Sequence, residues 1–197
     1  MKKLVFCLAA LILAAAFAGC APEKSEEITE KYVEKIVLDF GAEKLENGKI
    51  ESHKTRGFFF ENYFEDGSAL EMKYYFSWAA GKFVEKYSDW NTRFASPHGI
   101  GYSFPEEEFE EIIGTYFDAK AENLRGDKDF YCKEHNAYCW PGGGTGLPGQ
   151  QEIEILSYEK NGDVLSVHLS VGKNFTLLKV LLTENGGYRF LSHLPEQ

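Results

Sequence analysis

The stretch Glu152–Leu194 reads EIEILSYEKNGDVLSVHLSVGKNFTLLKVLLTENGGYRFLSHL and decides the fold. Short runs rich in aliphatic and aromatic residues alternate in it with turn residues. We expect four strands, at 152–159, 164–171, 175–183 and 188–194. Turns are expected at Asn161-Gly162, Gly172-Lys173-Asn174 and Asn185-Gly186-Gly187. Because these connections are short, they predict an antiparallel meander.

A helix is expected before this meander, from Pro105 to about Leu124. Ser103 can cap its first turn, and Pro105 suits a first turn because no backbone donor is needed there. Gly126 is a plausible stop. The predicted buried stripe comprises Phe109, Ile112, Ile113, Tyr116, Phe117 and Leu124.

This order, a helix followed by consecutive antiparallel strands, is similar in outline to cystatin-like and NTF2-like α+β folds. A second likeness rests on the helix at Pro105–Arg125, the segment Tyr131–Tyr138, the glycine-rich loop after it and the terminal Gly187–Ser192. That layout resembles small lipoproteins of Gram-positive bacteria that have no assigned activity. It implies a location and no particular chemistry.

The first half of the chain also predicts a helix followed by strands. Ile28, Tyr32, Ile36 and Phe40 recur every four residues, which indicates an amphipathic helix ending near Gly41. Two strands are expected at 57–64 and 69–76, joined by a hairpin turn at Asp66-Gly67. We expect a third strand at 82–90, with a short helix as the alternative.

The expected fold class is therefore α+β, with amphipathic helices packed on a curved antiparallel sheet. The helix-then-meander arrangement occurs twice in this prediction. Residues 28–197 form either one domain or two small units, 28–95 and 103–197. A chain of this length can bury a substantial core.

The first nineteen residues have the order of a secretory signal. Lys2 and Lys3 precede an apolar run from Leu4 to Phe17, which ends at Ala18-Gly19-Cys20. That run is shorter than the roughly 20 residues needed to cross a bilayer, so we expect cleavage of residues 1–19.

The segment Phe17-Ala18-Gly19-Cys20 resembles the lipobox of bacterial lipoproteins, although Phe17 stands where that family most often has leucine. The resemblance implies that Cys20 is acylated and becomes the first residue of the mature protein. Residues 20–27, which are charged after Pro22, would then form a tether to the lipid. The expected location is the extracytoplasmic face of the cell membrane, with the membrane as a partner through the lipid.

Two cysteines remain once Cys7 and Cys20 are set aside. Cys132 and Cys139 flank a polar hexapeptide that suits a turn, and an exported domain meets oxidising conditions. We therefore expect a Cys132–Cys139 disulfide. A metal site is the weaker alternative, because His135 lies between them but no second Cys pair or His cluster accompanies them.

The net charge of −10 argues against nucleic-acid binding, which requires a basic face. The glycine-rich loop at Trp140–Gly149 lacks the Gly-Lys-Ser/Thr of a phosphate-binding loop, and the five histidines have no metal-ligand spacing. No nucleophile elbow occurs. Catalytic residues, metals and cofactors are therefore not expected.

The aromatic segment is the best candidate for ligand binding. Trp78, Tyr87, Trp90 and Phe94 either pack in the core or border a groove for sugars or apolar ligands. We expect a non-catalytic, membrane-anchored module that binds an envelope protein, peptide or glycan. Two alternatives are a small-molecule or glycan receptor with an aromatic-lined pocket, and an envelope enzyme whose site the spacing does not reveal.

Overall fold

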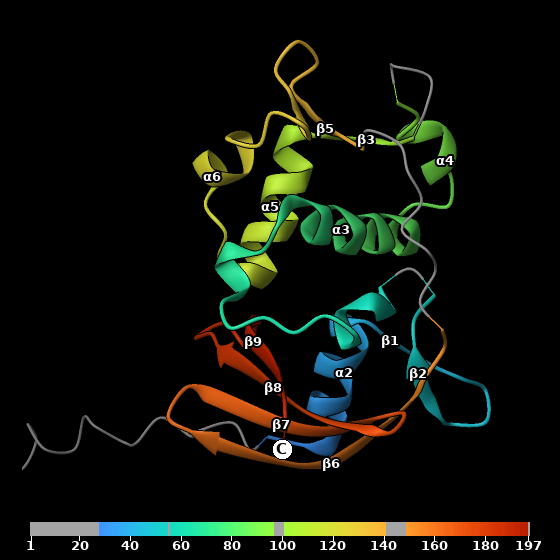
Figure 1. The fold of residues 1–197 in the computed structure, drawn as a ribbon, viewed down its shortest axis with the longest axis vertical. Helices are drawn as coiled ribbons and strands as arrows, with labels where there is room; N and C mark the ends of the chain where they lie inside the picture. Colours follow the sequence, from blue (N-terminus) through green and yellow to red (C-terminus); the bar gives the residue numbers. More distant parts are fainter. Residues whose placement is uncertain (1–27, 55, 97–100, 141–148, 197) are drawn as a thin grey trace, which may run out of the picture.

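The computed structural model describes residues 28–54, 56–96, 101–140 and 149–196. These residues form two layers, one built on a six-stranded sheet and the other on helices and a three-stranded sheet (Figure 1). Both sheets are antiparallel, so the predicted α+β class is confirmed. The expected signal, Cys20 and residues 20–27 lie outside the described residues.

The predicted meander is confirmed. Its strands are β6 (Glu152–Asn161), β7 (Val164–Val171), β8 (Asn174–Leu182) and β9 (Tyr188–Pro195). Burial alternates residue by residue along β7, because one face of the sheet covers the core. The register of β6 against β7 shifts between Ile155 and Ser157, which marks a β-bulge.

Two short strands from the first half complete the larger sheet. β1 (Ala42–Lys44) pairs with β2 (Ile50–Ser52), and β2 pairs with β6. The strand order is β1-β2-β6-β7-β8-β9. Segments far apart in the sequence therefore share one sheet.

The first predicted helix is confirmed as α2 (Glu30–Phe40). The Thr29 side chain accepts a hydrogen bond from the backbone of Tyr32 and caps the first turn. Val33, Ile36, Val37 and Phe40 are buried, as the four-residue spacing predicts. The Phe40 ring lies 5.0 Å from that of Phe190 on β9, so this face packs on the sheet.

The three strands expected at 57–64, 69–76 and 82–90 are wrong. This region contains η1 (Gly57–Phe60), η2 (Gly67–Ala69), α3 (Met72–Lys86) and α4 (Trp90–Arg93). The helix-then-meander order is therefore found in the second half. Among the described residues, the first half adds to the sheet the β1–β2 hairpin and one isolated bridge from Phe64 to His193 on β9.

The error has two physical causes. Buried residues of α3 recur at helical spacing, but apolar residues between them also create an alternating pattern. Asp66 does not open a hairpin: its side chain accepts a hydrogen bond from the backbone of Ser68 at 2.8 Å and starts the turn of η2.

The second predicted helix is divided. It runs as α5 (Glu106–Phe117), breaks at Asp118, whose φ of 57° is left-handed, and resumes as α6 (Ala121–Arg125). Ser103 is not a cap but the first residue of β3 (Ser103–Pro105). β3 pairs with β5 (Ala137–Cys139), which also pairs with β4 (Tyr131–Cys132).

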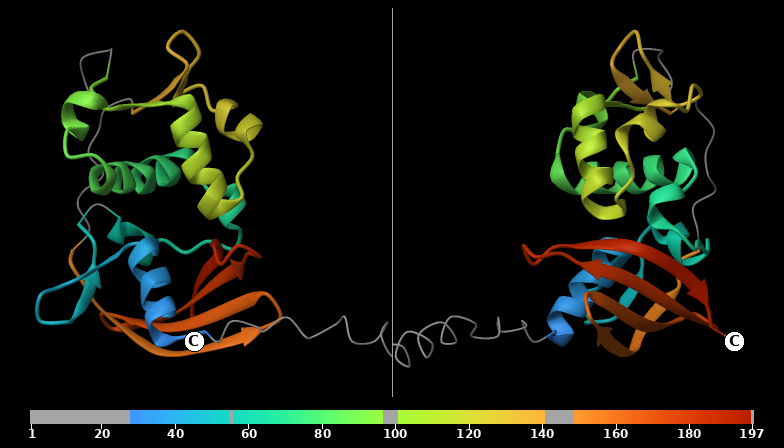
Figure 2. Two further views of the ribbon diagram at one scale, coloured as in Figure 1. Left: turned by 180° about the vertical axis from the view of Figure 1, so that it is seen from behind. Right: turned by 90° about the vertical axis from the view of Figure 1, so that its left-hand side faces the viewer.

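Aromatic side chains connect the two layers. The Trp78 ring of α3 lies 5.1 Å from that of Phe117 on α5 and 6.3 Å from that of Phe190 on β9. Buried residues of both layers belong to one core cluster. The second and third views show the helical layer stacked over the sheet (Figure 2).

Candidate functional site

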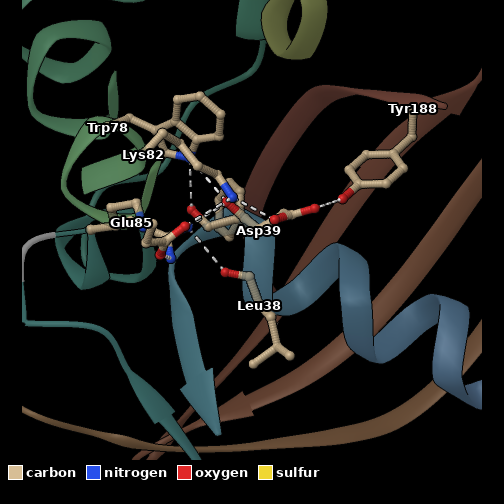
Figure 3. Close-up of polar contacts among 8 residues, drawn as sticks. Leu38, Asp39, Trp78, Lys82, Glu85 and Tyr188 are labelled. Carbon is tan, nitrogen blue, oxygen red and sulfur yellow. Dashed lines mark hydrogen bonds and ion pairs between the residues drawn. The ribbon is translucent and has the colours of Figure 1, made fainter. Parts of the chain in front are cut away.

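A cluster of charged side chains lies where the two layers meet (Figure 3). Asp39 comes from the last turn of α2, and Arg56 precedes η1. Lys82 and Glu85 lie on α3, and Tyr188 begins β9. Two cations and two carboxylates therefore meet from elements spread along most of the chain.

Arg56 satisfies the carboxyl end of α2. Its Nη1 donates to the carbonyl oxygens of Leu38 at 3.1 Å and Asp39 at 2.8 Å. The last turn of α2 carries no basic residue of its own. Since the end of a helix leaves carbonyls without intrahelical donors and carries partial negative charge, Arg56 supplies both donors and charge there.

The remaining contacts balance the charges. Arg56 Nη2 pairs with Glu85, and Lys82 Nζ pairs with Asp39. Tyr188 donates its hydroxyl to the other carboxylate oxygen of Asp39. Each carboxylate thus has a cationic partner in the cluster.

The indole of Trp78 joins the cluster to the aromatic core. Its Nε1 donates to the carbonyls of Asp39 and Phe40, both at 3.2 Å. The ammonium of Lys82 lies 5.5 Å from the centre of the Trp78 ring and 5.6 Å from that of Tyr116, which is within cation–π range.

A glycine makes room for the arginine. A Cβ at position 81 would overlap Cγ and Cδ of Arg56, so the stem of Arg56 crosses α3 where no side chain stands. Glycine inside a helix costs roughly 1 kcal/mol relative to alanine. Its presence at this position of α3 therefore has a packing reason.

Burial shifts the pKa of two groups in the cluster, Tyr188 and Arg56. Burial, followed by the nearby charge and hydrogen bond of Asp39, raises the pKa of Tyr188. Burial also lowers the pKa of the Arg56 guanidinium, an effect that Glu85 and Asp39 oppose. Tyr188 is accordingly a neutral donor to Asp39.

The two cations of the cluster are largely shielded from solvent, whereas Glu85 reaches the surface. Arg56 is 2% exposed, and the Lys82 side chain is 10% exposed. Arg56 and Lys82 line neither the groove between the β1–β2 hairpin and β6 nor the cavity between η2 and α6. The arrangement can hold the two layers together.

The four aromatic residues predicted to bind a ligand do not form an open groove. Trp78 and Phe94 are 0% and 1% exposed and belong to the core. Tyr87 and Trp90 are half-buried against that core. Tyr87 donates to Glu108 at 2.8 Å, and the Trp90 ring lies 4.6 Å from that of Tyr102. The structure favours the core-packing interpretation of these residues.

The expected disulfide is not present: Cys132 and Cys139 both retain thiols. The hairpin register pairs Cys132 with Ala137, whereas the backbone of Cys139 bonds to Phe130, so the cysteines are offset diagonally. Cys139 Sγ lies 3.4 Å from the Ser103 hydroxyl. Burial raises the pKa of the Cys139 thiol, and Cys132 adds a smaller effect in the same direction.

A second buried titratable group is His193 of β9. It is 0% exposed, and burial lowers its pKa to about 4. Within the described residues neither ring nitrogen has a partner of hydrogen-bond geometry, although the backbone of Asn62 and Phe59 opposes the shift. The ring lies 5.2 Å from that of Phe40 and 5.3 Å from that of Tyr63, which makes its surroundings aromatic. His193 is therefore neutral at pH 7.

The surface of the described residues is hollowed beside the β1–β2 hairpin and beside α6. A groove of about 370 Å³ lies between the tip of the β1–β2 hairpin and β6, lined by Lys49, Ile50, Glu154 and Ile155 among others. A second cavity of about 300 Å³ lies between η2, the start of α3 and α6. Leu156 on β6 and Phe175 on β8 are 46% and 55% exposed.

No family model matches the chain, and no curated protein or solved structure is significantly similar to it. The described residues contain no group of three His, Cys, Asp or Glu side chains that could hold a metal ion. None of the helices in the described ranges has the length and apolar character needed to span a bilayer.

The sequence did not predict the charge cluster. Its members lie between positions 39 and 188, and no spacing rule connects them. The sequence contains one local signal of the cluster: Gly81, which lies inside α3, directly precedes Lys82. An internal glycine beside a charged residue indicates a close approach by another part of the chain.

Proposed function

We propose that the protein is a lipid-anchored, extracytoplasmic binding module of the cell envelope, and that it is not an enzyme. The anchor rests on the segment Phe17–Cys20, its likeness to a lipobox and the preceding signal-like residues. Acyl chains on Cys20 would attach the domain to the membrane through residues 20–27.

One observation supports binding over catalysis. The side chains with strongly shifted pKa values, Tyr188 and His193, are buried, whereas the groove beside β6 is open to solvent. Tyr188 and His193 are 4% and 0% exposed. Elsewhere on the sheet, Leu156 on β6 and Phe175 on β8 expose apolar side chains.

The proposed partners are the membrane, through the lipid, and an envelope protein, peptide or glycan. A nucleic acid does not suit this surface because the chain has a net charge of −10. Among these, a peptide fits best, because the outer side of β6 beyond Ile153 has no strand paired with it among the described residues.

Metabolic labelling with a fatty-acid probe tests the anchor. The full chain and its Cys7→Ala variant should both carry the label, because Cys7 lies in the removed signal. Cys20→Ala should carry none and should leave the membrane fraction. Equal labelling of Cys20→Ala would refute the anchor.

A further inference from the structure

Strand β6 is much longer than the strand beside it. β2 pairs with it at Ile153 and Glu152. From Glu154 to Asn161, β6 pairs with β7 on one side, and no other described residue pairs with it on the opposite side. In Figure 1 this part of β6 lies at the border of the sheet, beyond the end of β2.

Two hydrogen bonds show which backbone groups face outward before the bulge. The amide of Gly172, just after β7, donates to the carbonyl of Glu152 at 2.9 Å, and that of Ser52, on β2, donates to Gln151 at 2.8 Å. Bonding direction alternates along an antiparallel strand. The N–H and C=O of Ile155 therefore point away from β7.

The same reasoning applies after the bulge. Leu182 donates to Asp163 at 2.7 Å, so odd-numbered residues of β7 bond to β8 and even-numbered residues bond to β6. Their partners on β6 are Ser157, Glu159 and Asn161. Tyr158 and Lys160 consequently direct their N–H and C=O groups outward, in line with those of Ile155.

The groove of about 370 Å³ lies at the start of this open edge. The hairpin tip at Gly48 and Lys49 diverges there from β6, because the last pair is Ile50 with Ile153. An added strand along β6 would end in this groove. Backbone pairing supplies the affinity in this mode of recognition, and alternate side chains supply the specificity.

The side chains of β6 define the partner. Glu154 and Glu159 are exposed and lie on the outer face, since they pair with Ser170 and Ser166 of β7. Ile155 and Tyr158 lie on the other face and pack partly against the core. A strand beside them would gain from cationic side chains on one face and apolar side chains on the other.

A second copy of the chain fits this edge poorly. Pairing of two β6 edges would gather the glutamates 154 and 159 of both copies on one face of the joined sheet, and like charges there are destabilising. The bulge at Leu156 also interrupts a regular ladder. Bulges and edge charges are devices that discourage edge-to-edge association of identical chains.

We propose that the open edge of β6 binds an extended peptide segment in which cationic and apolar residues alternate, adding it as a strand to the six-stranded sheet. This inference rests on the proposed function as a binding module and specifies its partner. It does not depend on the lipid, so loss of the label in the previous experiment and loss of peptide binding are separate outcomes.

Binding is measured on the full chain in detergent with a labelled peptide of about eight alternating lysine and valine residues. A peptide of the same composition with its lysines in one block is the control. The alternating peptide should bind more tightly, and its affinity should fall as salt is added. On binding, the amides of Ile155, Tyr158 and Lys160 should become protected from hydrogen exchange.

Two variants at one position isolate the backbone contribution. Lys160→Pro removes an outward N–H and a charge, whereas Lys160→Ala removes only the charge. Proline is tolerated on an edge where its position faces solvent. We expect Lys160→Pro to bind about fivefold more weakly than Lys160→Ala, the effect of one hydrogen bond. Glu159→Gln should also weaken binding of the cationic peptide.

Three results would overturn the proposal. The first is equal affinity for both peptides, or for both Lys160 variants. The second is protection of the three outward amides before any peptide is added, which would mean that another segment of this chain covers the edge. The third is a concentration-dependent dimer that protects the same amides, which would make a second copy the occupant.

Discussion

Replacing Arg56 by methionine tests whether the charge cluster holds the layers together. Methionine has a similar length and flexibility, so the cavity it leaves is small. The change removes two hydrogen bonds to the carbonyls of Leu38 and Asp39 and the ion pair with Glu85. A bond to a charged group contributes about 1.5 to 3 kcal/mol, which gives roughly 3 to 6 kcal/mol for the two carbonyls.

Two effects reduce that loss. Glu85 is 42% exposed on its side chain and can be hydrated once its partner is gone, and desolvation of the guanidinium no longer opposes folding. We therefore expect Arg56→Met to lower the free energy of unfolding by about 3 kcal/mol. Urea denaturation of the full chain measures this, and the midpoint should fall by about 1.5 M for a slope near 2 kcal/mol/M.

Arg93→Met is the matched control. Arg93 pairs with Glu108 at 3.4 Å, and its side chain is 43% exposed. Exposed pairs contribute at most about 1 kcal/mol, so the midpoint should move little. An Arg56→Met midpoint equal to or above that of the unsubstituted chain would refute the reasoning, because the cluster would then be replaceable by apolar packing.

Three further predictions concern buried groups. The pKa of His193 in the folded state is about 4, below its ordinary 6.5. The free energy of unfolding should therefore fall by about 3 kcal/mol as the pH falls from 6.5 toward 4, as measured by urea denaturation at each pH. The same dependence of stability on pH in His193→Gln would contradict this. Gly81→Ala should lower the melting temperature despite its better helix propensity, because the new Cβ displaces Arg56, and a higher value would show that Arg56 moves freely. Iodoacetamide should modify half-buried Cys132 faster than buried Cys139, whereas a cross-linked peptide in non-reduced digests would contradict the structure.

The meander and α2 could be predicted because each buries one face only. Buried and half-buried residues alternate along β7, and the buried residues of α2 recur at helical spacing, so a single period dominates each segment. Turn residues such as Asn161-Gly162 then fixed the strand order.

The region 57–90 could not be predicted in this way. Between Met72 and Phe83 the chain has apolar residues on most sides of α3, since that helix packs between α5 and the sheet layer. A helical and an alternating pattern then coexist, and tertiary packing decides between them. The short 3₁₀ turns before α3 depend on local side-chain contacts such as that of Asp66.

The charge cluster could not be predicted because its partners are distant in the chain. Arg56 faces carbonyls of α2, and Asp39 faces a tyrosine that lies 149 positions away. Sequence spacing reports neighbours on one helix or strand, and it carries no information about such encounters. The open edge of β6 was missed for a related reason, since the unequal lengths of β2 and β6 become apparent only when they pair.

The strand order has a consequence for the timing of folding. During synthesis, β2 cannot pair with β6 until Ile153, the partner of Ile50, has been made roughly 100 positions later. Until the meander emerges, Val33, Ile36 and Phe40 have no sheet to cover them. A nascent or truncated chain that ends before β6 should therefore expose the apolar face of α2, aggregate readily and require a chaperone. The isolated meander, in contrast, could begin to form from local contacts alone.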